Sequence, residues 1–411
     1  MRLIAATLFA VSLAGSADAA DLMTFWDKPQ HGGNSFNRLP PDETYFKALA
    51  GYGATWVRLS YDKWKPAKRD YLIGDADKYV GIPAADLKTL RQTLDDADKA
   101  GLKVVIAPLS LPGMRWAQNN GNKFDGRLWR DKAWWDQTAS FWRDLARELK
   151  NHPAVAAYNI VNEPAPEKNN GLAEHADPQA MQAWYDGKQG SAADLKAFYE
   201  TVIAAIREVD PATPIMADAG WYAAADAFSY WPSGLTDQKV LYSFHMYEPY
   251  AATSAPNIKR DKPYAYPGKV PFGEGEETWD RARAAAYIAK PVQWAKDKGV
   301  PLNRLVAGEF GCMRRWSSCK TYLEDVLTAL DKDDLHWAST ASGKTPGMAW
   351  TTSSARRPWA GNIGSRWKPM SATRRRAIRH RSSRPSAGGS PRIRDRVPPH
   401  ALEPGHAGRQ A

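Results

Sequence analysis

Residues 155–164 read VAAYNIVNEP, an apolar run that ends in Asn162, Glu163 and a proline. We interpret residues 155–162 as a buried strand, because a short apolar run with β-branched residues is typical of a strand covered on both faces. A carboxylate at the end of such a strand is costly unless the protein uses it. This stretch therefore predicts a parallel sheet with a functional group at its edge.

Six other segments repeat this pattern of a short apolar run next to a longer amphipathic segment. We predict these strands at residues 22–26, 55–60, 103–108, 214–219, 240–247 and 304–310. We predict helices at residues 42–50, 85–100, 134–150, 192–209, 276–298 and 322–331. Strands that alternate with helices form parallel βαβ units, and this number of them favours an α/β fold, a (β/α)8 TIM barrel. No glycine-rich phosphate loop follows a strand, which argues against a nucleotide-binding fold.

Residues 1–20 have the composition of a cleavable secretory signal peptide. Arg2 precedes an apolar stretch at residues 3–13, and small residues lead to Ala20. The stretch is too short to span a bilayer, and no later run approaches the ~20 apolar residues of a spanning helix. We predict a secreted or periplasmic protein with no membrane partner. A buried N-terminal strand is the alternative interpretation of this stretch.

The formal charge of +11 would suggest a nucleic-acid partner, but the charge is concentrated near the C-terminus. Residues 339–411 hold 13 Arg and 2 Lys against Asp395 and Glu403, a net charge of +13. Residues 1–338 therefore carry 11 − 13 = −2. We predict that the body of the protein does not bind nucleic acid. Polyanion binding by the basic segment is a minor alternative.

Three of the predicted strands end in polar residues. Glu163 follows the strand at 155–162, His245 and Tyr247 lie at the end of the strand at 240–247, and Glu309 lies near the end of the strand at 304–310. Catalytic residues of such barrels lie at the carboxyl ends of the strands. Glu163 and Glu309 come from opposite sides of the barrel mouth, so we expect them to face each other. Paired carboxylates in this arrangement are what cleavage of a glycosidic bond requires.

Together with Arg58 after the second strand, this ordered set resembles glycoside hydrolase family 5, the cellulase family. The resemblance covers about residues 22–338 and implies an enzyme that hydrolyses β-linked glycans with retention. It implies Glu163 as general acid/base and Glu309 as nucleophile, with the two carboxyl groups about 5–5.5 Å apart.

The resemblance also gives roles to four polar neighbours of this pair. Asn162 matches the residue that binds the sugar 2-hydroxyl, and His245 matches a residue lining the cleft near the acid/base. Arg58 and Tyr247 match groups that hydrogen-bond the nucleophile, and Arg58 would favour its ionised form. A structural ion pair for Arg58 and a satisfied strand-end histidine for His245 are the alternatives. One departure is that residues 107–113, APLSLPG, lack a histidine that the family often has there.

Tryptophans placed just after predicted strands are candidate sugar platforms, because flat aromatic faces stack on pyranose rings. These candidates are Trp26, Trp116, Trp221 and Trp316, with Trp221 as the first choice and core packing as the alternative for each.

The chain has two cysteines, Cys312 and Cys319. In an oxidising compartment they are candidates for a local disulfide, and two unlinked thiols are the alternative. Neither the cysteines nor the scattered histidines have metal-ligand spacing, so we predict no metal and no cofactor.

No eighth strand is predicted after residues 336–338, where the sequence becomes rich in Ser, Arg and Pro. Residues 338–354 can be back-translated so that a shifted frame encodes FYSFREDAWDGMDYEL, which resembles the closing segment of bacterial family members. We hypothesise that one nucleotide was lost near codon 338, and that residues 339–411 are a basic, disordered, out-of-frame tail. The barrel of residues 21–338 would then be incomplete, lacking strand eight and its helix and leaving strands one and seven as open edges.

We therefore predict that the protein is a monomeric endo-β-1,4-glucanase that acts on a polysaccharide or oligosaccharide. A β-mannanase, a xylanase and a β-1,3-glucan hydrolase are alternatives within the family. An inactive carbohydrate-binding protein is the alternative from another class, because a truncated barrel would lose part of its site.

Overall fold

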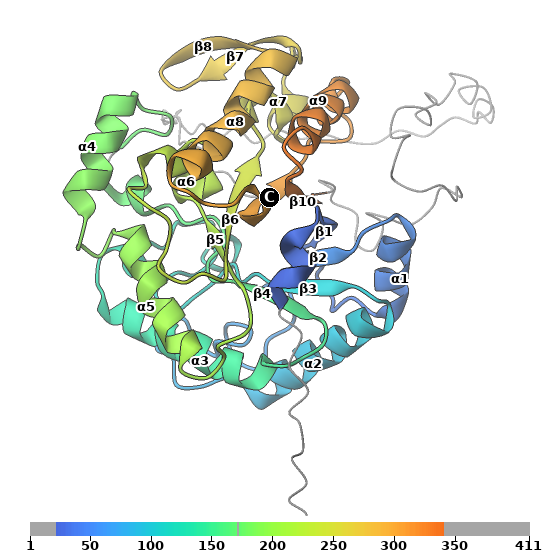
Figure 1. Cartoon of the computed structure of the whole chain (residues 1–411), viewed down its shortest axis with the longest axis vertical. Helices are drawn as coiled ribbons and strands as arrows, with labels where there is room; N and C mark the ends of the chain where they lie inside the picture. The colour runs from blue at the N-terminus through green and yellow to red at the C-terminus, as the bar shows by residue number, and fades with distance from the viewer. Residues whose placement is uncertain (1–21, 171, 341–411) are drawn as a thin grey trace, which may run out of the picture. The chain divides into compact units, whose positions relative to one another are not determined.

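The computed structural model describes residues 22–170 and 172–340 (Figure 1). Within them, eight parallel strands form a closed barrel, in the order β1-β10-β9-β6-β5-β4-β3-β2. The barrel strands are β1 His31–Ser35, β2 Trp56–Leu59, β3 Lys103–Ile106, β4 Val155–Asn159, β5 Ile215–Asp218, β6 Val240–Met246, β9 Leu305–Phe310 and β10 His336–Ser339. The prediction of a (β/α)8 barrel is confirmed.

Helices surround the barrel (Figure 1). They are α1 Glu43–Gly51, α2 Ala84–Lys99, α3 Ala133–Leu149, α4 Pro178–Lys188, α5 Leu195–Arg207, α6 Gly220–Ala223, α7 Tyr250–Thr253, α8 Arg281–Asp297 and α9 Cys319–Asp331. An antiparallel hairpin of β7 Gly268–Phe272 and β8 Gly275–Trp279 precedes α8. The predicted helix at 276–298 therefore begins too early. Asp280 caps α8 by accepting a hydrogen bond from the Arg283 amide at 2.9 Å, which fixes where the helix starts.

The predicted first strand at residues 22–26 is wrong. Leu22–Asp27 forms a 3-10 helix, η1, and the first strand is β1. The sequence of β1, HGGNS, has no β-branched run that would reveal it. Gly32 is required there, because a Cβ atom at this position would lie 2.6 Å from the Trp56 carbonyl oxygen and against its ring. The side chain of Trp56, on the neighbouring strand β2, fills the space that a β-branched residue of β1 would otherwise occupy.

The prediction that strand eight is missing is also wrong, whereas the helix that would follow it lies outside the described residues. The strand β10 pairs in parallel with β1, where His31 is opposite Trp337, and with β9, where His336 is opposite Val306. Neither β1 nor β9 is an open edge. The sequence hid β10 because the strand begins with a polar residue, His336, and directly precedes the change in composition.

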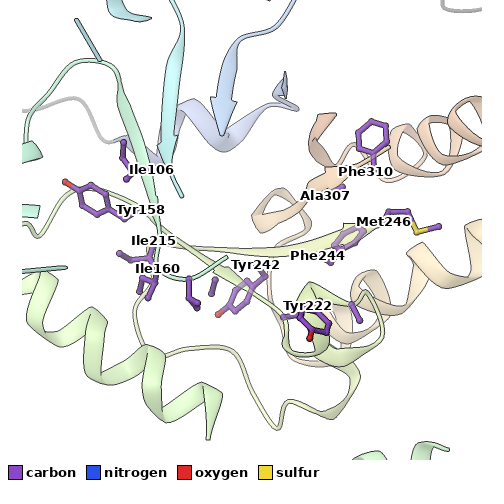
Figure 2. Close-up of a cluster of buried hydrophobic side chains, with 14 of the residues drawn as sticks. Ile106, Tyr158, Ile160, Ile215, Tyr222, Tyr242, Phe244, Met246, Ala307 and Phe310 are labelled. Carbon is purple, nitrogen blue, oxygen red and sulfur yellow. The ribbon is translucent and has the colours of Figure 1, made fainter. Parts of the chain in front are cut away.

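The barrel interior and the layer between strands and helices form two separate cores. Inward-facing Val105, Met216 and Leu241 pack with Trp56 inside the barrel. A larger cluster joins the outer faces of the strands to the helices, and Figure 2 shows part of it. The apolar faces of the helices thus hold the barrel rigid, which fixes the positions of side chains at its rim.

The predicted signal at residues 1–20 and nearly all of the predicted tail at 339–411 lie outside the described residues. Among the residues that the structure does describe, no helix is both long enough and apolar enough to cross a membrane.

Candidate active site

The six polar residues predicted from the strand ends meet at the carboxyl end of the barrel. They are Arg58 on β2, Asn162 and Glu163 after β4, His245 on β6, Tyr247 after β6 and Glu309 on β9. Burial differs sharply among them, because Arg58 and Glu309 are almost completely buried whereas Asn162 and Glu163 are partly exposed. The buried polar residues around Arg58 and Glu309 therefore form the floor of the site, and the Glu163 carboxyl group is more exposed than they are.

Both oxygens of Glu309 accept a hydrogen bond. Arg58 donates from Nη1 to Oε1 at 2.5 Å, and the Tyr247 hydroxyl donates to Oε2 at 2.7 Å. Burial raises the pKa of the Glu309 carboxyl, while the charges of His245 and Arg58 oppose that increase. Burial also raises the pKa of Tyr247 well above its ordinary value, so its hydroxyl stays a donor.

Glu163 lies beside His245, whose Nδ1 is 2.9 Å from the Glu163 Oε1 atom. Its backbone has a φ of 48°, in the left-handed region that L-residues rarely adopt. The Glu163 amide donates to Asp218 Oδ2 at 3.1 Å, which helps to hold this conformation. One carboxylate oxygen of Glu163 lies within 4.8 Å of one oxygen of Glu309.

Arg58 links four strands of the barrel through its guanidinium group. Its Nε donates to Asn159 Oδ1 at 2.9 Å, and its Nη2 donates to Asn162 Oδ1 at 2.7 Å. The same Nη2 lies 3.2 Å from Asp218 Oδ2. The positive charge of Arg58 is thus shared between Asp218 and Glu309, which makes the buried charges tolerable.

Three of the buried polar residues that build this floor were missed from the sequence: Asn34, Asn159 and Asp218. Asn34 on β1 donates to the Gly308 carbonyl at 2.9 Å, next to the nucleophile position. Asn159 on β4 donates to Asp218 Oδ1 at 3.2 Å. Asp218 did carry a signal, because it is a carboxylate at the end of the apolar strand β5, and Glu309 is similarly the next-to-last residue of β9.

The expectation that Trp26 forms a sugar platform is wrong. Trp26 is fully buried in η1, and its Nε1 donates to the Ala156 carbonyl at 3.3 Å. Its ring packs edge-on against Trp56 and His336. These partners lie where β2, β4 and β10 begin, so Trp26 closes the end of the barrel opposite the carboxylates.

The other three tryptophans follow strands at the carboxylate end, but two of them are covered. Trp221 and Trp316 are only 5% and 4% exposed, so neither presents an open face to a sugar. Trp316 also donates from Nε1 to the Tyr264 carbonyl at 2.8 Å. Trp116 is partly exposed, with the Lys63 ammonium 5.2 Å from its ring centroid. Trp116 is therefore the strongest of the four platform candidates.

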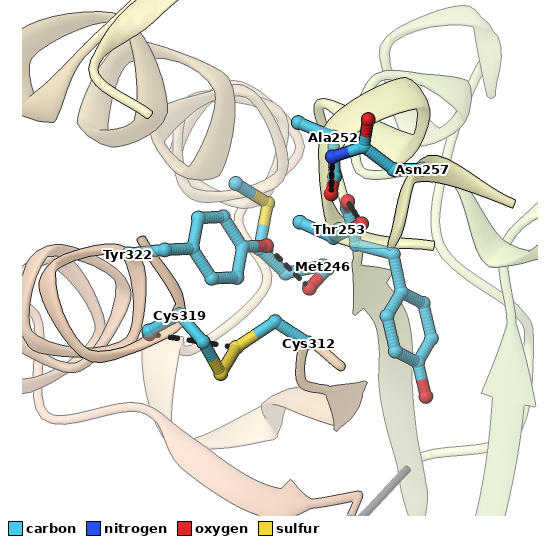
Figure 3. The surroundings of a disulfide bond; sticks show 8 residues. Met246, Ala252, Thr253, Asn257, Cys312, Cys319 and Tyr322 are labelled. Atoms are coloured by element: carbon cyan, nitrogen blue, oxygen red, sulfur yellow. Dashed lines mark hydrogen bonds between the residues drawn. A yellow bond between two sulfur atoms is a disulfide. The ribbon is translucent and has the colours of Figure 1, made fainter. Parts of the chain in front are cut away.

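The structure confirms the predicted disulfide between Cys312 and Cys319 (Figure 3). The bond links the loop after β9 to the first residue of α9. Close to it, the Tyr322 hydroxyl donates to the Met246 carbonyl at 2.9 Å, which ties α9 to the end of β6. Cys312 is three residues beyond Glu309, so the disulfide braces the segment that carries this carboxylate.

Two groups of side chains among the described residues bring possible metal-ligating atoms within 4.8 Å of one another. They are Glu163, His245 and Glu309, and Glu174, His175 and Glu248. In the first group, Arg58 already balances the charge of Glu309. In the second, the His175 Nε2 atom lies 3.2 Å from Glu248 Oε1, and its Nδ1 lies 3.6 Å from Asp226 Oδ2. Polar contacts within the protein account for the placement of these side chains, and we assign a metal to neither group.

Comparison with known families gives one match over most of the chain. Residues 18–344 match the family described as Cellulase (glycosyl hydrolase family 5). Among curated proteins, a beta-xylosidase of Phanerodontia chrysosporium is 24% identical over 317 residues, covering 72% of this chain and 54% of that protein. A probable glucan 1,3-beta-glucosidase A of Neosartorya fischeri is 26% identical over 204 residues, covering 49% of this chain and 41% of that protein. The chain thus spans about half the length of these curated relatives.

Solved structures with the same fold include several endoglucanases. A hyperthermophilic endo-beta-1,4-glucanase in complex with substrate superimposes with a TM-score of 0.57 at 17% identity, covering 80% of this chain and 93% of that one. The endoglucanase Cel5A of Pseudomonas stutzeri gives a TM-score of 0.52 at 19% identity, covering 76% and 88%. At these identities the likeness establishes the fold alone.

Proposed function

Because the chain belongs to the cellulase family of glycoside hydrolases, glycosyl hydrolase family 5, we propose that it cleaves β-linked glucan with retention, using Glu309 and Glu163. The observation that carries the proposal is the carboxylate pair, with one oxygen from each residue within 4.8 Å of the other. Retaining glycosidases hold their carboxyl groups about 5–5.5 Å apart, whereas inverting ones need about 6.5–9.5 Å to admit a water. The short separation supports the retaining mechanism.

In the first step, a Glu309 oxygen forms a bond to the anomeric carbon while the glycosidic C–O bond breaks. Protonated Glu163 gives its proton to the departing oxygen, which leaves as an alcohol. Arg58 and Tyr247 hold the two oxygens of Glu309 and so fix the direction of attack. The product of this step is a glycosyl ester on Glu309.

In the second step, ionised Glu163 takes a proton from water as the water oxygen bonds to the anomeric carbon. The ester bond breaks, and Glu309 leaves as a carboxylate beside Arg58. His245, 2.9 Å from Glu163, orients the acid/base and stabilises its charged form when the imidazole is protonated. Two inversions at the same carbon give net retention.

Asn162 and Trp116 are the groups that we assign to sugar binding. The Asn162 side-chain oxygen accepts a hydrogen bond from Arg58, so its amide N–H group is the part that donates to the sugar 2-hydroxyl. The partly exposed ring of Trp116 is suited to stacking against a pyranose. A β-1,4-glucan is our first choice of substrate, with endo cleavage.

Two other substrates have an observation in their favour. The curated relatives are named a beta-xylosidase and a glucan 1,3-beta-glucosidase, so xylan and β-1,3-glucan belong in any test. Mannan remains a family alternative without such support. The alternative of an inactive binding protein rested on a barrel that lacks strand eight, and the presence of β10 argues against it.

We propose that the protein works as a secreted or periplasmic monomer. The disulfide between Cys312 and Cys319 supports an oxidising compartment, because such bonds are rare in the cytoplasm. The predicted signal at residues 1–20 is consistent with the same location.

The decisive experiment combines a panel of polysaccharides with variants of the pair. We expect hydrolysis of β-1,4-glucan with a product of β configuration at early times by NMR. Glu309→Ala should lose at least about 10³-fold in kcat, and azide should restore turnover with an inverted product. Glu163→Ala should slow substrates with poor leaving groups most.

The matched control is Glu276→Ala, which removes an exposed carboxylate from the hairpin and should leave kcat unchanged. Full activity of Glu309→Ala, or an inverted product from the unaltered protein, would overturn the mechanism.

A further inference from the structure

A cavity of about 500 Å³ lies beside α4, away from the carboxylate pair. It is bounded by the end of α4, the start of α5 and the segment after the 3-10 helix η5 Ala227–Tyr230. Figure 1 shows α4 and α5 next to each other on one side of the barrel. The volume falls in the range of roughly 300–1,000 Å³ that is typical of ligand pockets.

We propose that this cavity is a second glycan-binding site, which holds a further segment of a β-glucan chain. The choice of ligand rests on the proposed function, whereas the existence of the site rests on the residues that line the cavity.

Aromatic rings form one wall of the cavity. Tyr185 stacks on Tyr230 with 5.6 Å between ring centroids and 14° between ring planes. Trp184 meets Tyr185 edge-on at 5.0 Å. Trp184, Tyr185 and Tyr230 are all partly exposed, so this wall is accessible as well as preorganised. Aromatic faces of this kind contact the C–H face of a pyranose without demanding a charge on the ligand.

The other lining residues carry hydrogen-bonding groups of several kinds. Lys188 and Gln189 end α4, and Asp194 and Glu200 come from the start of α5 and its second turn. Glu200 Oε1 accepts from the Thr236 amide at 2.8 Å, which fixes its side chain at the cavity. A lining that combines aromatic rings with donors and acceptors of both charges suits a polyhydroxylated neutral ligand better than a lipid or an anion.

One residue that lines the cavity is hydrogen-bonded to the loop that carries the proposed acid/base. The Tyr185 hydroxyl donates to Glu167 Oε1 at 2.5 Å, and Glu167 Oε2 accepts from the Trp221 amide at 3.1 Å. Glu167 is four residues beyond Glu163, and α5 begins on the carboxylate side of the barrel because it leads back to the start of β5. A glycan held in the cavity therefore lies on the same side of the barrel as the carboxylates.

A site at this position would raise the local concentration of polymer near the catalytic pair without touching the reacting atoms. It should therefore matter for long chains and not for short substrates that fill only the catalytic cleft. This difference separates glycan binding from a purely structural role of the aromatic wall.

The test uses Trp184→Ala in the full chain, with Gln182→Ala as the control on an exposed face of the same helix. Tyr185 is left intact, because its hydroxyl supports Glu167. Affinity is measured by native electrophoresis in gels containing hydroxyethylcellulose, β-1,3-glucan or xylan. Activity is measured on a chromogenic cellobioside and on hydroxyethylcellulose.

We expect Trp184→Ala to bind the polymer about tenfold more weakly and to retain the parent kcat/KM on the cellobioside. Equal retardation of parent, Trp184→Ala and Gln182→Ala in every gel would overturn the proposal, as would an equal loss on polymer and cellobioside. If retardation depends on Trp184 but no glycan is hydrolysed, the cavity site stands and the proposed function fails. If a glycan is hydrolysed but retardation in the gels does not depend on Trp184, the proposed function stands and the cavity site fails.

Discussion

At the level of single residues, the buried Arg58 determines how the site is built. It is fully buried and contacts Glu309, Asp218 and three asparagine side chains. A buried carboxylate is stable only when paired, so Glu309 and Asp218 both depend on the arginine. An arginine suits this position because its planar donors reach several acceptors at once, which a lysine could not do.

Removing the Tyr247 hydroxyl should shift the pH dependence of activity. The nucleophile must be ionised, so kcat/KM falls as the pH drops through the pKa of Glu309, which burial raises above its ordinary value. The hydrogen bond from Tyr247 opposes that increase. Tyr247→Phe should therefore move the acidic limb of the kcat/KM profile to higher pH, measured with a chromogenic glycoside.

Tyr266→Phe is the control for this experiment, because the Tyr266 hydroxyl donates to Asp325 and not to a carboxylate of the site. Its acidic limb should coincide with that of the parent. An unshifted limb in Tyr247→Phe would mean that Tyr247 does not act on the ionisation of the nucleophile.

Much of the site could be predicted from the sequence, because polar residues at the end of an apolar strand are easy to recognise as candidate functional groups. The supporting residues Asn34 and Asn159 could not, since each is an inward-facing amide inside a strand and its role depends on partners from distant strands. The tryptophan platforms were poorly predicted for a related reason. A position after a strand does not reveal whether a ring is covered, as Trp221 is.

At the level of secondary structure, the central strands were predictable because both faces are buried and apolar. The strands β1 and β10 were not predictable. They pair where the first and last strands of the barrel meet, which we call the seam. In β1 the need for space beside Trp56 selects glycine over the β-branched residues that mark a strand. In β10 the first residue, His336, is polar, and the strand directly precedes the change in composition. Such a strand takes its stability from its two neighbours rather than from its own composition.

The disulfide should stabilise the protein by about 2 kcal/mol, because it closes a short loop with a sequence separation of seven residues. The double variant Cys312→Ser with Cys319→Ser should lose that amount of unfolding free energy in urea titrations. Reductant should lower the stability of the parent to that of the variant and leave the variant unaffected. The prediction is contradicted if the unfolding free energy of the parent does not change when the disulfide has been shown to be reduced.

At the level of the whole molecule, closure of the barrel depends on a neutral histidine. His336 Nδ1 accepts from the Gln30 amide at 2.9 Å, and its Nε2 lies 3.1 Å from the Asn303 carbonyl. Burial lowers the pKa of His336 from 6.5 to about 4. One ring thus joins the segment before β1 to the loop before β9, but only while Nδ1 carries no proton.

This arrangement predicts a loss of stability in mild acid. The unfolded chain binds the histidine proton near pH 6.5, whereas the folded protein resists it down to about pH 4. The contribution of His336 is therefore complete above pH 6.5 and falls by roughly 3 kcal/mol as the pH drops to 4. Unfolding free energies from urea titrations between pH 4 and 7 would measure it.

In His336→Gln, the slope of unfolding free energy against pH should be shallower over the same range. His152→Gln provides the control, since that ring contacts the exposed Asp95 rather than the seam. Equal slopes in the parent and His336→Gln would show that another group governs the acid response.

The seam also sets the order in which the molecule can be completed during synthesis. The Gln30 amide and the His336 ring that meet there are 306 positions apart in the chain. An emerging polypeptide must therefore keep β1 without one of its neighbours until almost all of the barrel has been made. A factor that shields this strand edge during translation or export would raise the yield of folded protein without changing its final stability.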